Sequence, residues 1–167
     1  VESESVSLGL GMMSLAAAKA AEQGQDAQAI LKRINGIKQR LNVIFTVKTL
    51  EYLHKGGRIG GATAFLGSAL DIKPILYIND GRIEPLEKQR TRIRSISRLL
   101  ELTKEKAGAQ PIHVAILHGN TPEEAQQLEL LVRSQFNCAE LITADMGPVI
   151  GVHAGPGTLG LVFYTED

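Results

Sequence analysis

The sequence predicts an α/β fold in which helices form a two-layer sandwich with a mixed sheet of roughly six strands. The chain has 167 residues, of which 44% are hydrophobic and 22% charged, and these are ordinary values for one globular domain. Segments with apolar residues at helical spacing alternate with short runs that are rich in β-branched residues. One pair of predicted strands is joined by a tight turn, whereas others are joined by helices, and this combination is typical of a mixed sheet.

The first seventy residues are predicted to be mostly helical. Asp26 is a preferred N-cap, and Gly24 and Gly56 follow predicted helices, as glycines commonly do. The uncharged stretch Val6–Ala18 is expected to be a buried helix. The predicted elements here are a helix from Ser5 or Ser7 to about Glu22, a helix capped by Asp26, a strand over Val43–Val47, a short helix over Thr49–Lys55 and a small-residue helix over Gly61–Leu70.

The remainder of the chain alternates strands and helices. The run Asn79-Asp80-Gly81 predicts a tight hairpin turn, which needs residues with positive φ. Pro74 and Pro85 predict that the strands of this hairpin lie at a sheet edge or contain a bulge. Gly147–Gly157 contains two Gly-Pro steps and is expected to be a stiff, shaped loop. The predicted elements are strands over Ile72–Ile78 and Arg82–Lys88, a helix over Thr91–Lys106, a strand over Pro111–Leu117, a helix from Thr121 to about Phe136, and strands over Ala139–Ala144 and Thr158–Tyr164.

Charge and cysteine content exclude several classes of protein. The formal net charge is zero, and few aromatic residues accompany the basic residues, so nucleic-acid binding is not expected. The longest uncharged stretch near the start is too short for a membrane-spanning helix. Cys138 is the only cysteine, which favours a cytoplasmic location. A basic cluster over residues 82–98 forms either a solvated helix face or a contact for phosphates or an acidic partner.

Two glycine-rich segments interrupt the helix and strand patterns. Lys55–Gly61 contains four glycines and Arg58, and such a loop can bind an anion or can simply be a helix–loop–helix turn. Gly147–Gly157 contains His153 between small residues, where the imidazole can donate to an anion, act as a base, or be satisfied by the backbone. His54, His113 and His118 lack the spacing of metal ligands.

Several runs, taken together and in order, resemble the DegV family of bacterial fatty-acid-binding proteins. They are SESVSLGLG (residues 3–11), YLHKGGRIG (52–60), LG (66–67), IKPI (72–75) and GPVIGVHAGPG (147–157). The resemblance covers essentially the whole chain and implies that residues 1–167 form the C-terminal domain of a DegV-like fold. It implies that the family's N-terminal α/β domain is absent from this chain.

The resemblance also implies a function. A long-chain fatty acid such as palmitate, stearate or oleate would occupy an interdomain tunnel, with no other cofactor and no metal. Its carboxylate would be presented to an ATP-dependent fatty acid kinase subunit, so this chain would be a carrier and not itself an enzyme. His153 matches the family histidine that hydrogen-bonds the head group, and Arg58 matches an arginine associated with phosphoryl transfer or kinase docking.

The ligand-binding residues expected from this resemblance come from both glycine segments and the residues after the first. The helix Ala62–Leu70 either lines part of the acyl tunnel or belongs to ordinary core packing. The candidate set is His153, Arg58, Gly57, Ile59, Phe65, Leu66 and Gly155.

A second hypothesis stays open. The loop Gly56–Gly61 is also suited to act as an anion nest for a small phosphorylated metabolite, with His153 as a base in an enzyme or regulator. That hypothesis predicts a polar pocket without an apolar tunnel. The low polarity of residues 62–70 favours the carrier hypothesis.

Overall fold

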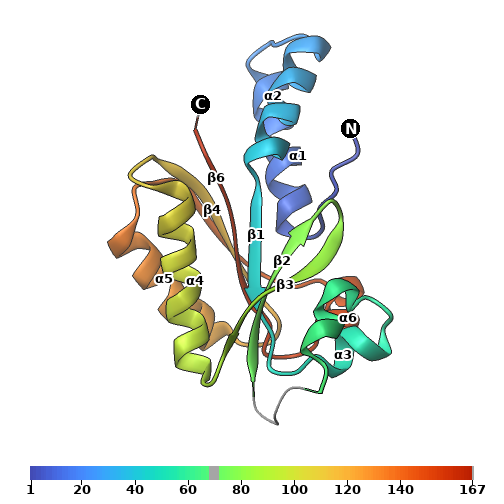
Figure 1. The fold of residues 1–167 in the computed structure, drawn as a ribbon. Helices are drawn as coiled ribbons and strands as arrows, with labels where there is room; N and C mark the ends of the chain where they lie inside the picture. Colours follow the sequence, from blue (N-terminus) through green and yellow to red (C-terminus); the bar gives the residue numbers. More distant parts are fainter. Residues whose placement is uncertain (68–71, 167) are drawn as a thin grey trace.

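The computed structural model describes residues 1–67 and 72–166 (Figure 1). Its helices are α1 Leu8–Glu22, α2 Ala27–Arg40, α3 Glu51–Lys55, α4 Arg92–Ala107, α5 Pro122–Gln135 and α6 Pro148–Ala154, with a 3₁₀ helix η1 at Gly60–Phe65. Its strands are β1 Asn42–Thr46, β2 Lys73–Asn79, β3 Arg82–Gln89, β4 Ile112–His118, β5 Cys138–Asp145 and β6 Leu159–Thr165. In the described ranges no helix is long and apolar enough to cross a lipid bilayer.

The strands form one mixed sheet in the order β3-β2-β1-β6-β4-β5. β4 and β5 are parallel, and the other neighbouring strands are antiparallel. The predicted α/β class with a mixed, six-stranded sheet is therefore confirmed. β6 lies between β1 and β4 at the centre, and its residues are buried on both faces from Leu159 to Tyr164.

Helices cover both faces of this sheet (Figure 1). Leu161 and Phe163 of β6 pack in one core with residues of α4 and α5. Val162 and Tyr164, which alternate with them, pack in a second core with residues of α1 and α2. The molecule thus has three layers rather than the predicted two, because its central strands carry apolar side chains on both faces.

Local signals locate most elements correctly. The Asp26 carboxylate accepts a hydrogen bond from the backbone N–H of Ala29 at 2.8 Å and caps α2 as expected. Asp80 and Gly81 have φ of 47° and 74°, as the predicted hairpin turn requires. The β2–β3 register shifts where Ile75 and Leu76 face β3, and β3 is an edge strand, as its proline predicts.

Three local expectations are wrong in detail. Residues 148–154 form the helix α6 and not a loop, because Pro148 suits a first helical turn and Gly155, with φ of 79°, ends it. The helix expected over Gly61–Leu70 is the 3₁₀ helix η1, and Leu70 lies outside the described residues. α1 is only partly buried, since Leu10 is 48% exposed.

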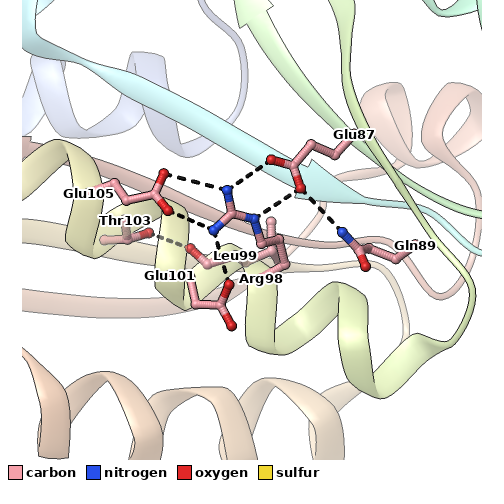
Figure 2. Close-up of polar contacts among 7 residues, drawn as sticks. All are labelled: Glu87, Gln89, Arg98, Leu99, Glu101, Thr103 and Glu105. Atoms are coloured by element: carbon pink, nitrogen blue, oxygen red, sulfur yellow. Dashed lines mark hydrogen bonds and ion pairs between the residues drawn. The ribbon is translucent and has the colours of Figure 1, made fainter.

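Arg98 joins α4 to the edge strand β3 (Figure 2). Its Nε and Nη2 donate to the two carboxylate oxygens of Glu87, each at 2.9 Å. Nη1 also donates to Glu101 at 3.0 Å and Glu105 at 2.7 Å. The hydrogen bond from Arg98 lowers the pKa of the Glu87 carboxyl. Part of the basic cluster predicted from the sequence is thus internally neutralised.

This network makes the free energy of unfolding depend on pH in the acidic range. Because the pKa of Glu87 is lower in the folded state than in the unfolded state, its contribution is complete above the unfolded value and is lost as pH falls through the folded value. We expect Arg98→Met to lower the free energy of unfolding by about 1–2 kcal/mol at pH 7, and by less below pH ~4. Urea denaturation at both pH values measures this, with Arg94→Met, on the exposed face of α4, as control. An equal loss at both pH values would contradict the assignment.

Candidate functional site

A cavity of about 550 Å³ lies on the face of the sheet that α1, α3 and α6 cover. Strands β1, β2, β3 and β6, the N-terminal segment Glu2–Val6, the loop after α3 and helix α6 all contribute to its wall. Most lining side chains are apolar, and they include Val43, Phe45, Leu53, Ile83, Met146 and Ile150. We call this space the apolar cavity. Its volume lies within the range of about 300–1,000 Å³ that is typical of ligand pockets.

The two glycine segments meet at one end of this cavity, because α3 packs directly against α6. A Cβ atom at Gly56 would overlap Nδ1 of His153, and one at Gly155 would overlap the ring of Tyr52. Each glycine therefore allows a side chain of the other segment to lie on its backbone. Two of the runs that carry the family resemblance, residues 52–60 and 147–157, thus form one contact, although about a hundred residues separate them.

His153 lines the apolar cavity from α6. Its side chain is half-buried, and in the part of the chain that the structure describes its buried Nδ1 has no hydrogen-bond partner. Because this nitrogen has almost no accessible surface and lies against Gly56, a ligand in the cavity would contact other atoms of the imidazole.

Arg58 and Gly57 line the same cavity from the loop after α3. Gly57 has a φ of 66°, which a residue with a side chain rarely adopts. Arg58 is exposed, and across residues 1–67 and 72–166 its guanidinium forms no hydrogen bond or ion pair. A free guanidinium and an imidazole at one cavity are suited to a carboxylate or a phosphate.

The other four candidate residues do not line the apolar cavity. Ile59 is buried in a core with Leu53 and Leu76, and Phe65 packs against that core beneath Lys88, whose Nζ lies 4.7 Å from the ring centroid. Leu66 is 43% exposed. Gly155 lies behind His153, against Tyr52. Of the two alternatives for residues 62–70, core packing therefore describes Ala62 and Phe65.

The structure adds lining residues that the sequence did not reveal. Met146 precedes the second glycine segment, and Ile83 and Arg82 follow the hairpin turn. The segment Glu2–Val6 lines the cavity as well. Residues 3–6 belong to one of the runs that carry the family resemblance, but no local pattern indicates that they line a cavity, because this position depends on the folded chain.

The first glycine loop, Lys55–Gly61, packs against β3 in addition to lining the cavity. A Cβ atom at Gly60 would overlap the carbonyl oxygen of Ile83, and one at Gly61 would overlap the carboxylate of Glu84. These glycines allow the loop to lie against β3. Of the two alternatives for this loop, an anion site at a helix start and a helix–loop–helix turn, the first loses support, because the element that follows, η1, is a 3₁₀ helix of six residues.

His54, His113 and His118 do not line this cavity. His113 stacks on Tyr164, whose pKa burial raises, and its ring nitrogens lie 3.2 Å from Glu140 and Glu166. His118 Nδ1 lies 3.4 Å from Asp145. Within the described ranges no group of three or more His, Cys, Asp or Glu side chains is placed to hold a metal ion.

Comparison with known sequences identifies relatives over nearly the whole chain. The family model described as "Uncharacterised protein, DegV family" matches residues 1–166. A DegV domain-containing protein of Halalkalibacterium halodurans is 41% identical over 151 residues, which are 90% of this chain and 53% of that protein. Protein DegV of Bacillus subtilis is 36% identical over 162 residues, which are 96% of this chain and 58% of that protein. This chain thus spans little more than half the length of these relatives.

Solved structures agree with the sequence relatives. A DegV family protein from Thermus thermophilus, described as fatty acid binding, has a TM-score of 0.94 and 34% identity, and the match covers 99% of this chain and 60% of that one. DegV of Bacillus subtilis, described as a fatty acid binding protein, has a TM-score of 0.85 and 36% identity with the same coverage.

Proposed function

Since this chain belongs to the DegV family, we propose that it forms part of a binding site for one long-chain fatty acid, with the acyl chain in the apolar cavity and the carboxylate near His153. The observation that carries the proposal is that one cavity combines a largely apolar wall with His153 and Arg58. The fatty acid binding described for the relatives from Thermus thermophilus and Bacillus subtilis supports it.

The two ends of a fatty acid need different surroundings, and this cavity offers both. Each methylene transferred from water to an apolar wall contributes about 0.8 kcal/mol, so side chains such as Phe45 and Met146 favour the chain. A carboxylate needs charge-assisted hydrogen bonds, which the imidazole of His153 and the guanidinium of Arg58 can donate. The second hypothesis, a small phosphorylated metabolite, requires a polar wall, whereas most side chains of this wall are apolar.

We also propose that the remainder of the site comes from an N-terminal α/β domain, as this chain spans 60% of its solved relative from Thermus thermophilus.

The role of the protein is then that of a cytoplasmic carrier, not of a catalyst. A partner kinase would bring ATP to the bound ligand. A carboxylate oxygen would attack the γ-phosphorus, and ADP would leave as an acyl phosphate forms. Exposed Arg58 supports this step, because a guanidinium can stabilise charge on the transferred phosphoryl group. Release of ADP by a fatty acid kinase subunit only when the loaded protein is present tests it.

Native mass spectrometry of the purified protein, followed by lipid extraction, tests the binding proposal. We expect a mass increment of one fatty acid that is lost on denaturation. We expect His153→Gln to weaken palmitate binding about 10–100-fold, because a hydrogen bond to a charged group is worth about 1.5–3 kcal/mol. His54→Gln, an exposed histidine on α3, is the matched control and should leave binding unchanged. Protein that carries no lipid and ignores added palmitate would overturn the proposal.

A further inference from the structure

A short N-terminal segment separates two cavities of similar size. Ser3, Glu4 and Ser5 line the apolar cavity, and the same three residues line a second cavity of about 550 Å³. The wall of this second cavity is mostly polar and includes Asn35, Lys38, Gln39, Asn79 and Asp80. We call it the polar cavity. Val43 and Ile78 also line both spaces, so the partition is only one backbone segment and two side chains thick.

The partition lies at the end of the apolar cavity opposite to His153. In the β1–β6 pairing, Phe45 faces Gly160 and Val43 faces Val162, and all four residues line the apolar cavity. Thr158 and His153 lie beyond the Gly160 end, whereas Ser3–Ser5 lies beside the tip of the β2–β3 hairpin, where the Cα of Glu4 approaches Gly81 (Figure 1). A chain whose carboxylate lies at His153 and that follows β1 therefore ends against this partition.

Contacts with other elements, and not its own backbone preference, hold the partition in place. Glu4 and Ser7 have φ of 49° and 50°, in the left-handed region that residues with side chains disfavour. The buried Ser5 Oγ has no hydrogen-bond partner in the described ranges, which is also unfavourable. An ion pair between the Glu4 carboxylate and Lys38 Nζ, at 3.0 Å, ties the segment to α2. Removing that contact should release the segment without disturbing the core.

We propose that Ser3–Ser5, held by the Glu4–Lys38 ion pair, sets the longest acyl chain that the site accepts. This inference rests on the proposed fatty acid site and assigns its specificity. With the ion pair intact, the terminal methyl group of a chain that is too long meets the partition. Without the ion pair, the segment moves toward the polar cavity and the longer chain passes.

Binding of palmitate and the longer arachidate to the wild type, Lys38→Met and Glu4→Gln tests the inference. We expect the wild type to bind arachidate about tenfold or more weakly than palmitate, and we expect this preference to fall to about threefold or less in both variants. Lys32→Met, on the same helix and outside both cavities, is the matched control and should keep the wild-type preference. The exchange Glu4→Lys with Lys38→Glu restores an ion pair and should restore the preference.

Each outcome separates this inference from the function on which it rests. Variants that bind palmitate but keep the full preference against arachidate would overturn the inference alone, as would a wild type that binds both acids equally. A wild type that binds neither acid would overturn the proposed function. Thermal unfolding of each variant checks that it is folded. We expect little change in the unfolding temperature, because an ion pair between two partly exposed side chains contributes little to global stability.

Discussion

Ile150→Trp is expected to weaken palmitate binding about a hundredfold. Ile150 lines the apolar cavity from α6, one turn before the end of that helix, and packs near Met146. An indole at this position would occupy space that about three or four methylene groups of a ligand need. At about 0.8 kcal/mol for each methylene, their exclusion costs ~3 kcal/mol, which is a hundredfold in affinity. Isothermal titration with palmitate measures the loss.

Val149→Trp is the matched control for this experiment. Val149 precedes Ile150 on the same helix but is 75% exposed and does not line the cavity. The same indole at this position should leave palmitate affinity within about twofold. Ile83, in β3, also lines the cavity, so Ile83→Trp repeats the test without altering α6. Folded Ile150→Trp and Ile83→Trp proteins that keep wild-type affinity would place the acyl chain elsewhere.

Among the single substitutions considered, Gly60→Ala is expected to lower the free energy of unfolding the most. Gly60 has a φ of 52°, and a Cβ atom there would overlap the carbonyl oxygen of Ile83. The left-handed backbone costs about 1–2 kcal/mol for alanine, and displacing the backbone of β3 costs about 1–3 kcal/mol more. We expect the free energy of unfolding to fall by roughly 3 kcal/mol, measured by urea denaturation with an unchanged m-value.

Gly24→Ala separates the two contributions. Gly24 follows α1 with a φ of 76°, and no other atom lies within 4 Å of its ideal Cβ position. Alanine there should therefore carry only the backbone cost of about 1–2 kcal/mol. Equal decreases in the free energy of unfolding for the two variants would show that the backbone of β3 at Ile83 is displaced at little cost. The close approach of the glycine loop to β3 would then not require glycine.

Local chemistry made most of the secondary structure predictable. Asp26 and Thr91 accept backbone hydrogen bonds at the starts of α2 and α4, and Asp80-Gly81 forms the hairpin turn, all within a few residues of sequence. Helix α6 was missed because glycine and proline are helix breakers on average. Pro148 and Gly155 mark its two ends, and only residues 149–154 between them needed to be helical.

The candidate site was predictable only in part. Resemblance to a family identified His153, Arg58 and Gly57, and all three line one cavity. It also suggested Ile59, Phe65, Leu66 and Gly155, which the structure places in a core, on the surface or behind His153. A residue's proximity to a motif in sequence does not decide which way its side chain points, because that depends on the element and on what packs against it.

By itself, the sequence determined the order of the elements, the mixed sheet and the two glycine segments, because periodicity, caps and turn residues act over a few positions. The tertiary structure decided the number of layers, the pairing of α3 with α6, and the partition that Glu2–Val6 forms. These features depend on contacts between residues far apart in the chain. Val162 and Phe163 are both apolar, and the sequence does not show which face of the sheet is hollow. The folded sheet places Val162 at the cavity and Phe163 in the core on the opposite face.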